Sequence, residues 1–232
     1  MARNKQLLEL VAQLRAETGR SQNVSVGVDE VENLKEILRR NQEVLYDDYD
    51  WPHMRVERSV TLAAGQRYYD LPSDLDFDRI TAIKYKYNNV YTDLERGISF
   101  DDFSIIDSNA DERSSPALKW DIRNTGNGEQ LEVWPIPNAT NTIRFFGTKQ
   151  LGALVEDNDT ADLDDRLIVL ASAAEVLSRQ KAPDAKIKID QFNNRLLVLR
   201  RNSQSESATV QVGLGGNMRD QSNRLKTRVI VS

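Results

Sequence analysis

The chain has 232 residues, of which 39% are hydrophobic and 29% are charged, a balance that is ordinary for a globular protein of one or two domains. The absence of cysteine excludes disulfides and thiolate metal sites, and the single histidine, His53, excludes most histidine-based metal and triad chemistry. The net charge is −5, with acidic residues gathered in 156–165 and basic residues in excess from Arg195 onward, which indicates surfaces that meet charged partners.

The N-terminal stretch carries apolar residues at helical spacing between Leu7 and Leu14, which predicts an amphipathic helix over about 4–17. Glutamates interrupt these apolar residues and no small-residue cleavage site follows, so the stretch does not read as a signal peptide. The sequence contains no run of about 20 apolar residues, so we expect no membrane contact and folding in a reducing cytoplasm.

A second apolar stripe predicts a helix over about 29–46, which Pro52 prevents from continuing. From Arg55 the apolar period changes to two. The stretch RVERSVTL, the turn AAGQ and the stretch RYYDLP together predict a β-hairpin. The strand FDRITAIKYKY then turns through Asn88 and Asn89 into VYTDLERG, and SFDDFSIID after it is either a short helix or an acidic loop.

Three further strands are predicted in LKWDIRN, in QLEVWPIP after a GNG turn, and in TIRFFGTK. The middle of the chain, about 53–150, is therefore expected to be an all-β unit of six or seven short strands. Helix returns in DDRLIVLASAAEVLSRQ, where acidic residues in the first turn and basic residues in the last complement the helix dipole.

A fourth helix follows the break at Pro183. Its apolar residues are Ile187, Ile189, Phe192, Leu196, Leu197 and Leu199. From Ser203 the chain is rich in Ser, Gln, Asn and Gly without a helical period, which predicts an extended arm.

The predicted fold class is α+β, a helical bundle with an inserted antiparallel β domain and an extended C-terminal arm. The expected parts are the first half of the bundle in 1–52, the β domain in 53–152, the second half of the bundle in 153–203 and the arm in 204–232.

In this order of elements the chain resembles the head-to-tail adaptor proteins of tailed bacteriophages, the family that includes the tail tubular protein of short-tailed phages. The stretches that carry the resemblance are YDDYDWPHMR, RSVTLAAGQRYYDLPSDLDFDRI, LEVWPIP leading into TIRFFGTK, and EDNDTADLDDRLIVLASAAEVL. The resemblance covers roughly residues 30–200 and leaves the first helix unmatched.

The resemblance implies a structural virion protein in the neck of the particle, assembled in the host cytoplasm as a homo-oligomeric ring, a dodecamer. Such a ring docks beneath the portal protein, lets DNA pass through its channel without specific binding, and provides the attachment site for a tail nozzle or tail tube protein. C-terminal arms of family members clasp the portal. The family brings no catalytic residues and no cofactor.

Several features resemble other sites but lack required parts. The stretch GLGG at 213–216 has no strand before it and no helix after it, so it reads as a hinge at Gly213, Gly215 and Gly216 and not as a phosphate cradle. The acidic stretch 157–162 lacks the glycine and the final glutamate of a common calcium loop, and a helix cap explains it better.

The carboxylates in 101–112 favour a solvated loop over a hydrolase pair, and they also suggest an acidic lining for a DNA channel. His53 has no nucleophile partner signature near it, which favours a structural role. We therefore predict no catalytic, cofactor-binding or metal-binding residues and no enzyme activity.

The arm combines basic residues with an apolar end, and strand addition to a partner's sheet would use both. The predicted docking residues, assigned to the portal by the resemblance, are Arg219, Arg224, Lys226, Arg228, Val229, Ile230 and Val231. Phosphate binding by the same basic residues leaves a second function open, that of a DNA-binding accessory protein, and plain disorder is the third alternative.

Overall fold

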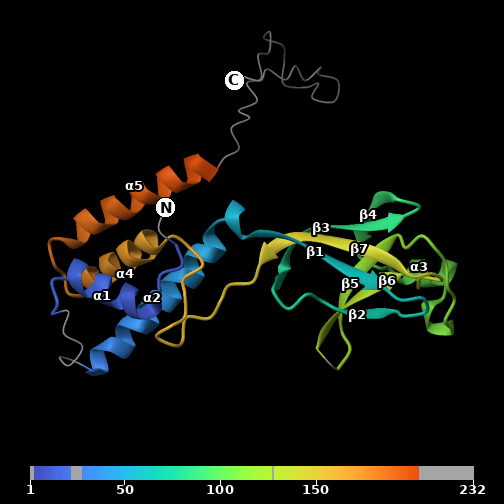
Figure 1. Cartoon of the computed structure of the whole chain (residues 1–232), viewed down its shortest axis with the longest axis horizontal. Coiled ribbons are helices and arrows are strands. Elements are labelled where there is room, and N and C mark those ends of the chain that lie inside the picture. The colour runs from blue at the N-terminus through green and yellow to red at the C-terminus, as the bar shows by residue number, and fades with distance from the viewer. Residues whose placement is uncertain (1–2, 22–27, 127, 204–232) are drawn as a thin grey trace, which may run out of the picture.

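The computed structural model describes residues 3–21, 28–126 and 128–203. Figure 1 shows an elongated molecule with its long helices at one end and a curled sheet at the other. We call these two parts the helical unit and the β unit. They have separate hydrophobic cores, one built mainly from helices and one from strands.

The helical unit contains α1 (Leu7–Glu17), α2 (Val28–Asp48), α4 (Asp165–Arg179) and α5 (Ala185–Ser203). Helix α4 is its centre, because α1, α2 and α5 all pack on it. Ten of the fifteen residues of α4 are buried, which matches the dense apolar face predicted for this segment. Four predicted helices are thus confirmed, with bounds that differ by up to three residues at the first helix.

The N-terminal segment is tied to the loop before α4. Residues Arg3 and Gln6 form isolated antiparallel bridges with Asp164 and Thr160. The amide of Ala161 donates to the carbonyl oxygen of Lys5 at 3.0 Å. These backbone bonds explain why α1 begins only at Leu7, three residues later than predicted, since they hold the preceding residues in a non-helical conformation.

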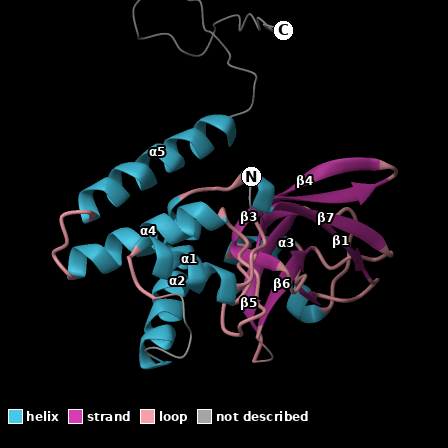
Figure 2. Ribbon diagram, turned by 60° about the vertical axis from the view of Figure 1, so that its left-hand side comes forward, coloured by secondary structure: helices cyan, strands magenta, loops and turns pink. Residues whose placement is uncertain are grey.

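Helix α5 buries only some of the apolar residues that the sequence places in the fourth helix. Phe192, Leu196 and Leu199 face the helical core, whereas Ile187, Ile189 and Leu197 lie exposed at the surface. The reason is that α5 packs mainly on α4, at the edge of the bundle, so only one narrow face of it is covered (Figure 2).

The β unit is a single curled sheet of seven strands in the order β1-β7-β3-β4-β5-β6-β2. The strands are β1 (Arg55–Leu62), β2 (Tyr68–Asp70), β3 (Leu75–Tyr87), β4 (Val90–Arg96), β5 (Lys119–Asn124), β6 (Glu129–Trp134) and β7 (Asn141–Lys149). The hairpin predicted at Asn88 and Asn89 is confirmed. Both asparagines have positive φ, 48° and 62°, as a tight turn between paired strands requires.

The hairpin predicted across AAGQ is wrong. Strand β1 pairs along all eight of its residues with β7, and the three-residue β2 pairs with β6, so the two strands lie at opposite ends of the strand order. A three-residue strand could offer β1 only a few hydrogen bonds, whereas β7 pairs with all eight residues of β1. Pairing with β7 is therefore the more stable arrangement for β1.

The β unit is also neither all-β nor fully antiparallel. The segment between β4 and β5 contains the helix α3 (Phe100–Ile105) and the 3₁₀ turn η2 (Ser108–Ala110), while η1 (Pro52–Met54) leads into β1. Because this long segment crosses over before β5 begins, β4 and β5 pair in parallel at Glu95↔Lys119 and Arg96↔Trp120. The sheet is therefore mixed.

No helix in the described parts of the chain combines the length and the apolar character needed to cross a membrane.

Candidate functional site

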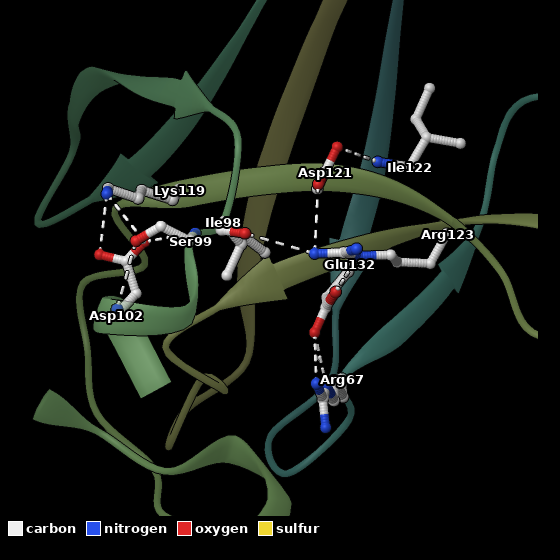
Figure 3. A network of polar contacts seen from close by, with 9 residues as sticks. All are labelled: Arg67, Ile98, Ser99, Asp102, Lys119, Asp121, Ile122, Arg123 and Glu132. Carbon is white, nitrogen blue, oxygen red and sulfur yellow. Dashed lines mark hydrogen bonds and ion pairs between the residues drawn. The ribbon is translucent and has the colours of Figure 1, made fainter. Parts of the chain in front are cut away.

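The end of the β unit farthest from the helices is built around α3. Ser99 and Asp102 form a capping box, in which the Ser99 amide donates to Oδ2 of Asp102 at 2.7 Å and the Asp102 amide lies 3.4 Å from Oγ of Ser99. Nζ of Lys119 on β5 donates to both Asp102 oxygens, at 2.8 and 2.9 Å (Figure 3). The Lys119 ammonium is the main cause that lowers the pKa of the Asp102 carboxyl, and the Ser99 amide adds to it.

A buried carboxylate lies beside this helix in the sheet. Glu132 on β6 is 1% exposed, and its two oxygens accept from two guanidinium groups. Nε of Arg67 lies 2.7 Å from Oε1, and Nε of Arg123 lies 2.9 Å from Oε2 (Figure 3). Asp121 forms a further ion pair with Arg123 at 3.3 Å. A buried charge is stable only when it is paired in this way, so the two arginines and Glu132 depend on one another.

The same arginines hold the α3 segment against the sheet. The Arg67 guanidinium lies 5.3 Å from the centre of the Phe103 ring, and its Nη1 donates to Asn109 Oδ1 at 2.8 Å. Nη2 of Arg123 donates to the carbonyl oxygen of Ile98 at 3.3 Å. Indole Nε1 of Trp134 donates to the Ile106 carbonyl oxygen at 3.0 Å. Contacts before, within and after α3 thus fix its position.

A cleft of about 660 Å³ opens beside this network. It is lined by Arg67, Tyr68, Ile98, Phe100, Phe103, Asn109, Arg123, Asn124, Thr125 and Glu132. Both arginine charges are already engaged by Glu132, and these lining residues include neither a histidine nor a cysteine. The arrangement favours binding and positioning, with Glu132 held by the two arginines.

A second polar cluster joins the helical unit to the β unit. The Tyr46 hydroxyl on α2 lies 2.6 Å from Oδ2 of Asp76 and 3.0 Å from the Lys149 carbonyl oxygen. The Arg79 guanidinium lies 4.2 Å from the Tyr46 ring centre and donates to the Tyr46 carbonyl oxygen at 2.7 Å. Burial, with the Asp76 hydrogen bond next, raises the pKa of the Tyr46 hydroxyl, so this group stays protonated and neutral.

Two buried aspartates, Asp164 and Asp165, lie at the start of α4. Asp164 caps α4 by accepting from the Leu167 amide at 3.0 Å and pairs with Arg195 on α5. Asp165 is 1% exposed and accepts from the Lys5 amide at 3.3 Å through one oxygen. Burial raises the pKa of the Asp165 carboxyl.

Carboxylates of the acidic stretch 157–162 accept hydrogen bonds from other groups of the chain. Asp159 accepts from the amides of Val155 and Glu156, and Asp162 accepts from the Gly152 amide and from Lys149. In the parts of the chain that the structure describes, no three residues of the metal-binding types gather as a site. Nε2 of His53 lies 3.1 Å from the Asp162 carbonyl oxygen, a contact between the two units.

Comparison with protein-family models gives a match to the SU10 adaptor protein over residues 5–213. This match spans both the helical unit and the β unit. The chain belongs to the SU10 adaptor protein family, a family of phage head-to-tail adaptors. A comparison with curated proteins finds no relative that matches.

The family match confirms the predicted resemblance and extends it to α1, which the resemblance alone left unmatched. The predicted docking and hinge residues of the adaptor all lie in the arm 204–232, outside the described residues. Those assignments stay predictions. They are Gly213, Gly215, Gly216, Arg219, Arg224, Lys226, Arg228, Val229, Ile230 and Val231.

The network around Glu132 was missed by reading the sequence of the adaptor. The sequence signal for this network is a single charged residue, Glu132, inside the otherwise apolar run LEVWPIP. A charged residue among buried apolar residues indicates that it is paired. The partners Arg67 and Arg123 lie 65 and 9 residues away from Glu132, so no local spacing connects all three.

Proposed function

We propose that this adaptor protein assembles as a dodecameric ring beneath the portal protein of a phage. The ring extends the channel through which DNA passes without specific binding, and it provides the attachment site for the tail nozzle or tail tube protein. The observation that carries this proposal is the family match over residues 5–213, which includes both units of the chain.

In this proposal the two ends of the molecule have different tasks. Residues 1–52 and 153–203 form the bundle that makes contacts between neighbouring subunits, and residues 53–152 form the domain that faces the tail. Two separate cores at opposite ends of an elongated molecule support such a division (Figure 1).

The arm 204–232 is proposed to reach the portal, with the glycines 213–216 as its hinge. A ring of arms binds by avidity, so each arm needs only a modest affinity of its own. The protein acts in the neck of the virion after assembly in the host cytoplasm, without a cofactor and without catalysis.

Cryo-electron microscopy of the assembled particle tests the proposal directly. We expect a ring of this chain between portal and tail. We also expect a chain that lacks residues 213–232 to fold normally but to lose its binding to the portal. An adaptor ring found elsewhere in the virion contradicts the function, and unchanged portal binding by the shortened chain contradicts the role of the arm.

Solution measurements separate this function from the alternative of a DNA-binding accessory protein. We expect the free chain to sediment as a monomer or a weak oligomer and to form the ring on its partner. Affinity for duplex DNA that is measurable at low salt and falls steeply as salt is raised would favour the accessory protein instead.

A further inference from the structure

The helix α3 displays two large apolar side chains to solvent. Phe100, its first residue, is 88% exposed, and Ile105, its last residue, is 73% exposed. Phenylalanine normally buries most of its surface, and exposed aromatic residues of this kind are typical of the anchors that protein interfaces use. We call Phe100, Asp101 and Ile105 the α3 knob.

The α3 knob is held rigidly by polar contacts on its inner side. The capping box of Ser99 and Asp102 starts the helix, Lys119 holds Asp102, and Trp134 holds the carbonyl oxygen of Ile106 after the helix ends (Figure 3). A six-residue helix has little stability by itself, so these contacts serve to fix it in place. A fixed anchor loses little conformational entropy on binding, which favours affinity.

The carboxylates around the knob differ in how they are paired. Asp102 and Asp111 form ion pairs with Lys119 and Arg113. Among the described residues, Asp101 forms no ion pair, and the carboxylates of Asp107 and Glu112 accept only backbone amides. An apolar anchor with an unpaired carboxylate beside it fits a pocket whose floor is apolar and whose rim carries lysine or arginine.

Charge and position decide which partner covers the knob. Two copies of this chain meeting knob to knob would bring their carboxylates together, and such like-charge contacts cost affinity. Helix α5, after which the arm begins, ends beside the junction of the two units, where Tyr49 contacts Ser203, whereas α3 lies at the far end of the β unit (Figure 1). Both observations favour a different protein at the distal end of the β unit.

We infer that the α3 knob is the contact by which this adaptor binds the tail, with Phe100 and Ile105 inserted into an apolar pocket of a tail protein and Asp101 paired with a basic residue on its rim. This inference rests on the proposed function, because that function places the β unit on the tail side. It assigns the attachment of the tail to three named residues.

The test measures binding of the full-length chain to each purified tail protein of the same phage and, separately, to its portal protein. The variants are Phe100→Ser, Asp101→Lys and, as a matched control, Val90→Ser, which changes another exposed apolar residue of the β unit. We expect Phe100→Ser to weaken binding to one tail protein by about tenfold or more. Asp101→Lys weakens it by about threefold or more at low salt and less at high salt.

Val90→Ser leaves tail binding unchanged, and all three variants bind the portal as the parent chain does. Thermal unfolding of each variant checks that the exposed substitutions leave the fold intact. Equal tail binding by Phe100→Ser and the parent chain overturns the inference while leaving the proposed function in place.

The remaining outcomes also decide the question. Binding to the portal with binding to no tail protein overturns the inference alone, whereas binding to neither overturns the proposed function as well. Self-association that Phe100→Ser abolishes assigns the knob to a second copy. Binding of a synthetic peptide of residues 217–232 that Phe100→Ser abolishes assigns it to the arm, and either result overturns the inference.

Discussion

In the helical unit the side chains that join the elements are mainly apolar, whereas at the distal end of the β unit charged side chains hold α3 to the sheet. Helix α1, for example, inserts Leu7, Leu10 and Leu14 with no exposed surface into the helical core. Helix α3 is held instead by the ion pair of Asp102 with Lys119 and by the arginines around Glu132.

The difference teaches how each region responds to change. An apolar core loses stability when buried volume is removed. A polar network loses stability when one charge is left without its partner, and its contribution to stability changes when its groups are protonated. The helical unit is therefore a rigid base, and the distal end of the β unit is a positioned surface.

The largest expected effect is in the helical core. Leu10→Ala removes a fully buried side chain from α1 and is expected to lower the free energy of unfolding by about 3–5 kcal/mol, because a cavity remains. Urea denaturation measures this loss. The matched control on the same helix is Leu8→Ala, at an exposed position, which is expected to change stability by less than about 0.5 kcal/mol. Equal losses would show that α1 is not part of the core.

Removing the buried carboxylate comes next. Glu132→Ala is expected to lower the free energy of unfolding by about 3 kcal/mol, because Arg67 and Arg123 lose their shared partner. Glu129→Ala, at an exposed residue of the same strand, is the control for urea denaturation. A Glu132→Ala variant as stable as the control would mean that the arginines are fully rehydrated and that the network contributes little.

The cap of α3 has a smaller effect on stability. Ser99→Ala is expected to cost about 1 kcal/mol, because the first turn loses a side-chain acceptor. The control is Ser104→Ala, an exposed residue of the same helix. Hydrogen exchange of the α3 amides is the sharper measurement, and unchanged exchange after Ser99→Ala would contradict a rigid knob.

The two regions should respond to acid in opposite directions. The pKa of Asp165 is raised in the folded state, so its ionised form disfavours folding above that pKa, and this penalty disappears as pH falls toward 3.8. Asp165→Asn is therefore expected to stabilise the protein at neutral pH. The pKa of Asp102 is lowered, so its stabilisation is present above 3.8 and is lost as pH falls through the lowered value.

Denaturation of both asparagine variants over a pH series checks the signs. Asp165→Asn should remove a term that disfavours folding at high pH, and Asp102→Asn a term that favours folding at high pH. For each variant, the change in the free energy of unfolding relative to the parent chain is plotted against pH. Slopes of the same sign for the two variants would contradict the contrast between the two regions.

The sequence predicted several local features because their causes are local. Asn88 and Asn89 tolerate the positive φ of a tight turn, so the β3–β4 hairpin was readable. The apolar residues of α1 and of α4 repeat at helical spacing, and this spacing can be read from the sequence alone. The predicted ring, arm and domain boundaries are not decided by these local patterns and stay predictions.

Other features depend on partners far away in the chain. Whether β1 pairs with β2 or with β7 is decided by the ladder that β7 offers more than 70 residues later. The exposure of Ile187, Ile189 and Leu197 depends on α5 lying at the edge of the bundle, which the residues of α5 do not encode by themselves.

The amino-acid sequence by itself determined the positions of the four long helices, the β3–β4 hairpin and the resemblance to phage adaptors, because periodicity, turn residues and motif order are properties of nearby residues. Only the tertiary structure decided that Glu132 is buried between two arginines and that Phe100 is displayed on a fixed helix. Whether a side chain is buried or exposed depends on which surfaces of the fold meet. The local sequence around a charged or aromatic residue does not specify this.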